Sequence, residues 1–246
     1  MLEAVSAFKA YDIRGIAGED ITTDFSRRLG SAIVEFTQAT SIAVGRDIRA
    51  SGESLKAALI QGIVESGCTV MDLGIVPTGV VYRSTVDLDV DSAIAITASH
   101  NPPEYNGFKI MHEGLPVAGG DLQRLKAIFE SPGRGKSNSP GTIVSKSEYH
   151  HTVIDAIVQD VGPLSRRVRV AVDSANAVPG PFMVELCDKL GVDLVDLNCS
   201  WDHGSPAHPA DPTRPENMTQ LSDLVANSDC EFGIGVDGDG DRIGVV

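Results

Sequence analysis

Apolar runs of strand length alternate with helical patterns in the first half of the chain. Three such runs lie at residues 41–45, 68–73 and 92–96. Apolar residues recur at helical spacing across residues 52–66, and a helix-like stretch covers residues 78–85, so a helix separates each run from the next. This order predicts a mainly parallel sheet with right-handed crossovers and helices on its faces.

A second cycle of the same kind follows a break rich in proline, glycine and serine. The break covers residues 131–142, and after it come helices at 147–161, 181–190 and 218–227 and strands at 169–172, 193–197 and 232–236. With 246 residues, 42% of them hydrophobic, the chain is long enough for two domains with cores. We predict an α/β fold with two successive three-layer α/β/α domains on mixed, mainly parallel sheets, at residues 1–140 and 141–246.

A polar loop follows the third apolar run. It reads Thr97-Ala98-Ser99-His100-Asn101-Pro102-Pro103. Because proline biases the residue before it toward an extended or turn conformation, the loop is stiffened around Ser99. The Ser99 hydroxyl is a candidate nucleophile, since ligand sites in such sheets lie beyond the carboxyl ends of strands. The alternative is an ordinary strand-to-loop turn.

Three carboxylates stand within five residues after the last predicted strand. They are Asp237, Asp239 and Asp241. Like charges repel at close range, and the intervening glycines let the backbone turn so that all three side chains lie on one side of a loop. Oxygen ligands of this kind favour a hard divalent ion, Mg²⁺ before Ca²⁺. The alternatives are a plain hairpin joining residues 232–236 to 243–246 and an EF-hand, which fits poorly because Arg242 stands where that pattern wants glycine.

A serine loop and an aspartate triplet together indicate phosphoryl transfer. Such a site would be negative even with a dication, so a bound phosphate needs added positive charge. Arg242 can supply a guanidinium for phosphate oxygens. Lys109 follows the loop on a short returning strand, and Arg14 stands in an early motif. Each cation taken alone is more often a solvated surface charge.

Four segments occur in the order seen in the α-D-phosphohexomutases. They are residues 11–15 (YDIRG), 45–49 (GRDIR), 97–103 with 105–109 (TASHNPP and YNGFK), and 237–242 (DGDGDR). The chain resembles that family over essentially its whole length, and it is most similar to the bacterial phosphomannomutase/phosphoglucomutase branch. The resemblance implies an enzyme that moves phosphate between the C1 and C6 oxygens of a hexose through phosphorylated Ser99. Hexose phosphates and hexose 1,6-bisphosphates are the implied substrates.

The resemblance also implies a role for each charged residue. The aspartate triplet would bind Mg²⁺ together with one oxygen of the phosphate on Ser99, which makes Ser99 part of the metal site. Arg14 and Lys109 would lie at the serine and assist proton transfer and charge stabilisation, with Arg242 nearby. A phosphoserine carries about −1.5 to −2 charges at neutral pH, so a dication and fixed donors suit it.

Two polar residues next to Ser99 are assigned to the same site. Neighbouring side chains of an extended loop point to opposite faces, so we expect no direct catalytic pair between Ser99 and His100. No G-x-S-x-G motif is present either. We expect His100 to bind phosphate or order the loop within the catalytic group, and Asn101 to bind phosphate with Arg242.

Net charge and cysteine usage limit which partners and which cellular compartment the protein is expected to have. A net charge of −14 argues against nucleic acid or an anionic membrane as a partner. No stretch approaches the roughly 20 apolar residues of a membrane span, and residues 1–5 lack the basic start of a signal peptide. Cys68, Cys187, Cys199 and Cys230 are widely spaced, which favours buried free thiols in the cytoplasm over a disulfide or zinc site. His203 and His208 lack compact spacing, so solvated loop histidines are favoured over metal ligands.

Members of the resembled family have four domains, and only the first two have counterparts in this sequence. The second domain is therefore expected to be incomplete near its last strand. We expect an N-terminal fragment with little turnover alone, whose partner is the missing C-terminal half or another copy of the chain. The alternative is a non-catalytic metal- or phosphosugar-binding module. The sequence does not distinguish mannose from glucose phosphates.

Overall fold

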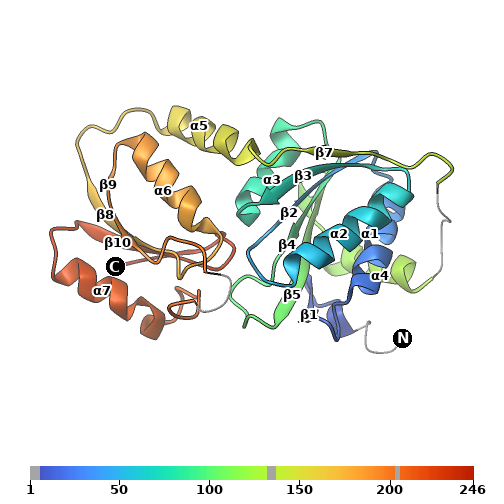
Figure 1. Cartoon of the computed structure of the whole chain (residues 1–246), viewed down its shortest axis with the longest axis horizontal. Helices are drawn as coiled ribbons and strands as arrows, with labels where there is room; N and C mark the ends of the chain where they lie inside the picture. Colours follow the sequence, from blue (N-terminus) through green and yellow to red (C-terminus); the bar gives the residue numbers. More distant parts are fainter. Residues whose placement is uncertain (1–5, 132–136, 203–205) are drawn as a thin grey trace.

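A computed structural model describes residues 6–131, 137–202 and 206–246, which form two sheets with helices on their faces (Figure 1). The expectations for residues 1–5, for the middle of the 131–142 break and for His203 lie outside the described residues. Within the described residues, no helix has both the length and the apolar character needed to cross a membrane.

The first sheet has the order β1-β5-β4-β2-β3-β7, with β6 paired to β5. Its strands are β1 (Ile13–Ile16), β2 (Ser41–Arg46), β3 (Thr69–Ile75), β4 (Ser92–Ile96), β5 (Tyr105–His112), β6 (Leu115–Pro116) and β7 (Ile143–Ser145). Strands β4, β2, β3 and β7 are parallel, whereas β5 runs antiparallel to both β4 and β1. The chain therefore reverses between β4 and β5, and the predicted serine loop lies in that reversal.

Helices cover both faces of the first sheet, as Figure 1 shows. One face packs against α1 (Thr23–Thr37), α2 (Gly52–Glu65) and α4 (Gly119–Glu130), and the other against α3 (Thr78–Asp87). Because side chains alternate along a strand, Ile42 and Val44 join the first core and Ala43 joins the second. The result is a three-layer arrangement, as predicted.

The second sheet is smaller and has the order β11-β10-β8-β9. It consists of β8 (Arg169–Asp173), β9 (Asp193–Leu197), β10 (Phe232–Val236) and β11 (Ile243–Val245). Strands β10, β8 and β9 are parallel, and β11 returns antiparallel to β10. Helix α6 (Pro179–Leu190) packs on one face, and η2 (Pro215–Met218) leads into α7 (Thr219–Ala226) on the other.

Helix α5 (Tyr149–Val161) links the two sheets. The Tyr149 hydroxyl donates to Asp87 on α3 at 2.8 Å. On the second domain, Lys189 on α6 donates to Asp155 at 2.7 Å. One helix thus has polar contacts with both halves of the molecule.

The predicted strands and helices of both cycles are confirmed within a few residues. Strands β4, β9 and β10 have the predicted bounds, whereas β1, α1 and α4 were not predicted. Strand β7 follows residue 140 yet pairs with β3 of the first sheet. The domain boundary at residue 140 stays a prediction. All four cysteines are free and buried, as expected.

Candidate functional site

The serine loop, defined as residues 97–103, leaves the carboxyl end of β4 at the centre of the first sheet. Ser99 is 2% exposed and has φ 53°, a left-handed conformation that residues other than glycine seldom adopt. Its backbone N–H donates to the Thr97 hydroxyl at 2.8 Å. The loop thus presents a buried serine in an unusual backbone conformation.

The acid loop, defined as residues 236–242, joins β10 to β11. The hairpin alternative is therefore correct for the backbone, because β10 and β11 pair antiparallel. The carboxylates of Asp237, Asp239 and Asp241 nevertheless converge, with ligand oxygens within 4.8 Å of one another. Asp237 Oδ1 accepts hydrogen bonds from the backbone N–H groups of Asp241 and Arg242, each at 2.9 Å. One oxygen of Asp237 thus fixes the backbone of the loop, while ligand oxygens of the three carboxylates lie close together.

The serine loop and the acid loop are in direct contact. The Ser99 hydroxyl donates to Asp237 Oδ2 at 2.7 Å. The hydroxyl of Thr78, at the start of α3, donates to Asp239 Oδ2 at 2.6 Å. A Cβ on Gly238 would lie 2.3 Å from the Ser99 carbonyl oxygen, so this approach requires glycine. The predicted serine and the predicted metal ligands therefore form one site, although they come from different domains.

Two of the predicted cations lie among the carboxylates. Lys109 Nζ lies 2.6 Å from Asp239 Oδ2 and 2.6 Å from Asp241 Oδ2. Arg242 Nη2 lies 2.9 Å from Asp237 Oδ2 and also donates to the Ser99 hydroxyl. Three carboxylates surrounded by two cations leave the cluster with a negative excess when all are ionised.

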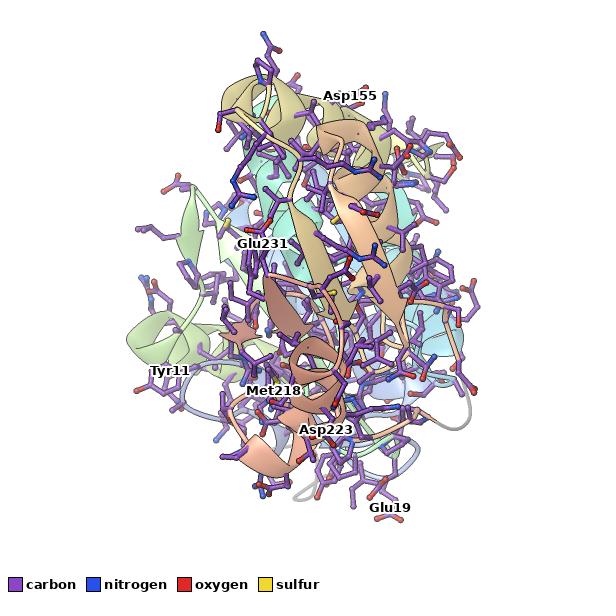
Figure 2. All side chains as sticks on the ribbon, turned by 90° about the vertical axis from the view of Figure 1, so that its left-hand side faces the viewer. Tyr11, Glu19, Asp155, Met218, Asp223 and Glu231 are labelled. Atoms are coloured by element: carbon purple, nitrogen blue, oxygen red, sulfur yellow. The ribbon has the colours of Figure 1, made fainter. Side chains whose placement is uncertain are left out.

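Arg14 and Asn101 lie beside the serine rather than on it. Arg14 donates to the Asn101 side-chain oxygen at 2.5 Å and to Asp12 at 2.5 Å. The neighbouring Tyr11 ring is 82% exposed and lies at the surface in Figure 2. The early motif thus contributes one guanidinium that reaches the serine loop through Asn101.

Burial and close charges shift the acidities within the cluster. Burial and the neighbouring Asp239 raise the pKa of Asp237 to about 6. Burial also acts to raise the pKa of Asp239, but the Lys109 ammonium outweighs it and holds the pKa of that carboxyl below its ordinary value. Against its own burial, the pKa of Lys109 is raised by Asp239. The excess of three carboxylates over two cations, rather than any single shift, is what favours a further cation here.

His100 differs from the prediction. Its Nδ1 lies 3.3 Å from the Ser99 hydroxyl and 2.7 Å from Arg242 Nη2, so the two neighbouring side chains do meet. The expectation of opposite faces assumed an extended loop, and the left-handed conformation of Ser99 removes that assumption. Burial and the Arg242 charge lower the pKa of His100, which favours the neutral ring.

His208 is not a solvated loop histidine, contrary to the prediction. Its Nε2 lies 2.9 Å from a carboxylate oxygen of the buried Asp173, and its Nδ1 lies 3.0 Å from the Pro209 carbonyl oxygen.

A different group of potential metal ligands, found in the described residues, is formed by His150, His151 and Glu185. Lys189 lies 3.0 Å from Glu185, so that carboxylate already has a cation beside it.

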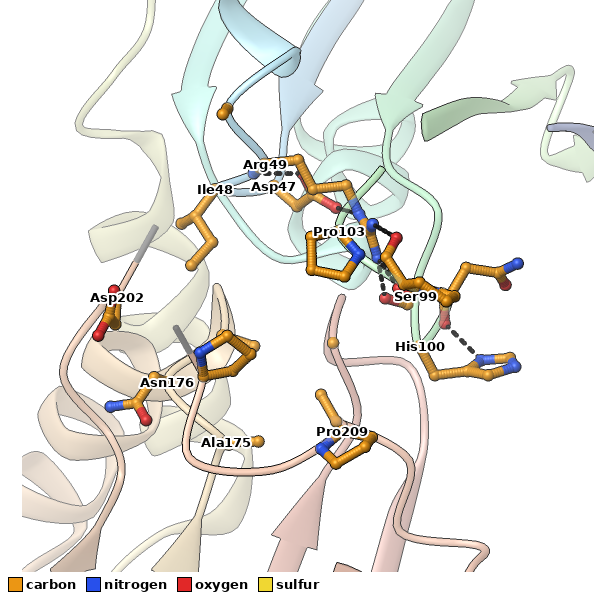
Figure 3. A pocket seen from close by; sticks show the side chains of 17 residues that line it. Asp47, Ile48, Arg49, Ser99, His100, Pro103, Ala175, Asn176, Asp202 and Pro209 are labelled. Atoms are coloured by element: carbon orange, nitrogen blue, oxygen red, sulfur yellow. Dashed lines mark hydrogen bonds and ion pairs between the residues drawn. The ribbon is translucent and has the colours of Figure 1, made fainter. Parts of the chain in front are cut away.

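A cavity of about 270 Å³ lies beside the serine (Figure 3). Ser99, His100 and Arg49 line it from the first domain, and Asn176 and Pro209 line it from the second.

Arg49 and Thr78, which both contact the site, were not among the predicted site residues. Arg49 stands in a motif that the sequence analysis singled out without a role, whereas Thr78 carries no local signal.

Comparisons with known proteins agree over both domains. Residues 5–135 match the family described as phosphoglucomutase/phosphomannomutase, alpha/beta/alpha domain I, and residues 148–246 match domain II of that family. The phosphoglucomutase of Neisseria meningitidis is 39% identical over 245 residues, which cover 97% of this chain and 52% of the relative. The phosphomannomutase/phosphoglucomutase of Pseudomonas aeruginosa is 38% identical over 244 residues, 98% of this chain and 52% of the relative.

A solved structure gives the same result. A phosphoglucomutase/phosphomannomutase family protein from Burkholderia thailandensis superimposes with a TM-score of 0.90 at 37% identity, over 98% of this chain and 54% of that protein. The chain therefore spans about half the length of the relatives that it matches.

Proposed function

The chain belongs to the phosphoglucomutase/phosphomannomutase family, and on that premise we propose that it carries the phosphate-transfer half of a phosphohexomutase. Ser99 is the phosphate carrier, and a hexose 1,6-bisphosphate is the donor. The Ser99 oxygen forms a bond to phosphorus while the bond from phosphorus to the sugar oxygen breaks. The proton of the serine hydroxyl passes by way of Asp237 Oδ2 to the departing sugar oxygen, which leaves as a hydroxyl. Reversal at the other sugar oxygen moves phosphate between C1 and C6.

One observation carries this proposal: the buried Ser99 hydroxyl contacts both Asp237 and Arg242. A plain turn serine has no reason to be buried against a carboxylate cluster and a guanidinium. Asp237 Oδ2 accepts the hydroxyl proton, so a proton acceptor is already aligned with the reacting oxygen. Arg242 lies where it would donate to the oxygens of a phosphate on Ser99.

The remaining residues act by position and charge. Phosphoryl transfer has a loose transition state, and catalysis of it is mostly positioning and electrostatic stabilisation. Lys109 lies against Asp239 and Asp241 of the acid loop and compensates their charge. Asn101 is held by Arg14 and lines the same cavity as Ser99, which suits a contact to phosphate. The neutral His100 ring can accept from Arg242 and hold that guanidinium over the serine.

The acid loop suits Mg²⁺. Asp237, Asp239 and Asp241 would hold the ion, and their converging oxygens are the ligands that a hard dication prefers. Asp239 is 1% exposed, and its Oδ1 is buried without a hydrogen-bond partner in the described residues. A cation would satisfy that oxygen. Bound there, Mg²⁺ would supply positive charge next to the phosphate on Ser99.

The test is incorporation of phosphate into Ser99. The protein is incubated with glucose 1,6-bisphosphate and Mg²⁺, and its intact mass is compared with that of Ser99→Ala. We expect one added phosphate in the natural sequence and none in the variant. A chain that binds Mg²⁺ but takes no phosphate would be a metal- or phosphosugar-binding module, and the carrier role would be wrong.

Turnover is expected to need more than residues 1–246. A mutase must release a bisphosphate and rebind it in the other orientation, and binding energy from the distal phosphate supports the chemical step. We expect little or no mutase turnover from residues 1–246 alone and recovery on addition of a separately expressed C-terminal half. Full turnover by residues 1–246 would mean that they, or a second copy of the chain, supply the distal contacts.

A further inference from the structure

Arg49 makes an unusual set of hydrogen bonds to the serine loop (Figure 3). Its Nη1 donates to two carbonyl oxygens, at 2.6 and 3.0 Å, its Nη2 donates to two more, each at 2.7 Å, and its Nε lies 3.1 Å from a carboxylate oxygen. The acceptors are the carbonyls of Pro102, Tyr105, Ser99 and Asn101 and the carboxylate of Asp47.

These contacts use the whole guanidinium. A guanidinium has five N–H donors in a planar fork, and five acceptors surround this one. The Arg49 side chain is only 10% exposed. No N–H group of Arg49 is therefore left to bind a phosphate. Arg242, in contrast, donates to the Ser99 hydroxyl itself.

Three of the four carbonyls that Arg49 binds, those of Ser99, Asn101 and Pro102, lie in the serine loop outside any strand. Thr97 makes the last ladder contact of this segment, with its N–H on the Gly107 carbonyl. Beyond that point the chain turns, and Ser99 adopts its left-handed conformation. Partly buried carbonyl oxygens need donors, and an unusual backbone conformation persists only where its surroundings hold it. Arg49 supplies both.

Asp47 ties this arrangement to the sheet. Its Oδ1 accepts the backbone N–H of Arg49 at 2.9 Å, and its own N–H donates to the Ile96 carbonyl at the end of β4 at 3.0 Å. Asp47 is 3% exposed, so the pair is screened from solvent. The guanidinium is thus anchored to the strand that precedes the serine loop.

We propose that Arg49 is a positioning residue that holds Ser99 in its left-handed conformation, so that the hydroxyl faces Asp237 and Arg242. The Ser99 carbonyl that Arg49 grips is the one against which Gly238 packs, so the same contact sets the distance to the acid loop. The catalytic consequence rests on the proposed function, whereas the structural one does not. Lysine cannot substitute, because three donors on one nitrogen do not reach four carbonyls spread around a planar fork.

The test compares Arg49→Lys with Arg27→Lys. Arg27 is also an arginine of the first domain, but its guanidinium pairs with Glu65 of helix α2 at 2.6 Å and with no serine-loop carbonyl in the described residues. The first measurement is amide hydrogen exchange over residues 97–105. We expect exchange there to accelerate at least about tenfold in Arg49→Lys, while amides of β2 and β4 and the whole of Arg27→Lys keep the natural pattern.

The second measurement is the rate of Ser99 phosphorylation by glucose 1,6-bisphosphate. We expect Arg49→Lys to lower the maximal rate about a hundredfold, in the range of a misplaced catalytic group, with the half-saturating bisphosphate concentration nearly unchanged. Partial unfolding would lower the amount of protein labelled rather than the rate of the folded fraction. Natural exchange together with a natural rate in Arg49→Lys would overturn the proposal.

The two measurements separate the two proposals. If the natural protein takes no phosphate, the carrier role of Ser99 is wrong, and exchange over residues 97–105 still decides the role of Arg49. If Arg49→Lys does not fold, Asp47→Asn keeps the guanidinium and removes the carboxylate that aligns its Nε. We then expect roughly tenfold effects on both measurements. An Asp47→Asn protein with a rigid serine loop and the natural rate would contradict the proposal.

Discussion

The serine loop and the acid loop meet at one site but keep their shapes by different means. The serine loop is held from outside, by the guanidinium of Arg49 on its carbonyl oxygens. The acid loop is shaped from within, by backbone N–H groups on Asp237, and its remaining carboxylates are balanced by Lys109 and Arg242. The serine is thus positioned by directional hydrogen bonds to its backbone, whereas the carboxylates are kept together by the charges of neighbouring cations.

Lys109→Ala should have the largest effect, because it removes the cation that lies against both Asp239 and Asp241 of the acid loop. We expect phosphoryl transfer to Ser99 to slow by about 10²–10⁴-fold, the usual range for loss of a positioned acid, base or charge stabiliser. The fold should survive, as thermal unfolding would show. A variant that transfers phosphate at the natural rate would return Lys109 to the ordinary surface charges.

Asp239→Asn tests the acid loop alone. One of three ligand carboxylates loses its charge, so Mg²⁺ affinity should fall by more than about a hundredfold, since loss of even an outer-shell partner costs about 10–100-fold. Titration calorimetry measures the affinity, with the exposed Asp89→Asn as control. Unchanged affinity would leave the acid loop a plain hairpin.

Gly238→Ala tests the contact between the two loops. The added Cβ would lie 2.3 Å from the Ser99 carbonyl, a backbone atom that Arg49 holds in place. Overpacking of this kind costs about 1–3 kcal/mol, which corresponds to roughly a 5- to 150-fold loss of the closed arrangement. The rate of Ser99 phosphorylation reports it. Gly79→Ala is the matched control, because a Cβ there meets open space.

The pH dependence of stability should report how the segment next to the acid loop is held. His208 Nε2 lies 2.9 Å from Asp173, and the Ala210 carbonyl in the same segment accepts the Gly238 N–H at 3.1 Å. The hydrogen bond to Asp173 raises the pKa of His208 above its ordinary value of 6.5. Its stabilisation is therefore complete below about pH 6.5 and is lost as the pH rises through the folded-state pKa.

The measurement compares unfolding free energies of the natural protein and His208→Gln from pH 5.5 to pH 9. After allowance for solvent screening, the difference between them should shrink by roughly 0.5–1 kcal/mol as the pH rises. A difference that stays constant with pH would mean that the histidine charge does not support this segment.

Local patterns predicted most of the fold and the two loops that meet at the candidate site. Strands β4 and β10 and the loops after them could be read from short-range periodicity, because a strand followed by Ser, Asp or Gly at its end is a local signal. The apolar spacing of Phe25, Leu29 and Ile33 is a local signal for helix α1 as well.

The errors concerned backbone conformation and distant partners. The direction of His100 depends on a single left-handed φ at Ser99, and no residue type near it requires that conformation. His208 meets Asp173, which lies 35 residues away, and Arg49 meets carbonyls about 50 residues away. Such contacts follow from the packing of sheets and loops, so a reading of neighbours along the chain could not reveal them.

The central claim is that the phosphate carrier and the metal-binding carboxylates form a single site. Phosphorus NMR of the phosphorylated protein tests it directly, with Mn²⁺ added in place of Mg²⁺. We predict that Mn²⁺ broadens the phosphoserine resonance beyond detection in the natural sequence and leaves it sharp in Asp239→Asn at the same Mn²⁺ concentration. A resonance that stays sharp in the natural sequence while Mn²⁺ saturates the acid loop would place the metal away from Ser99 and contradict the account.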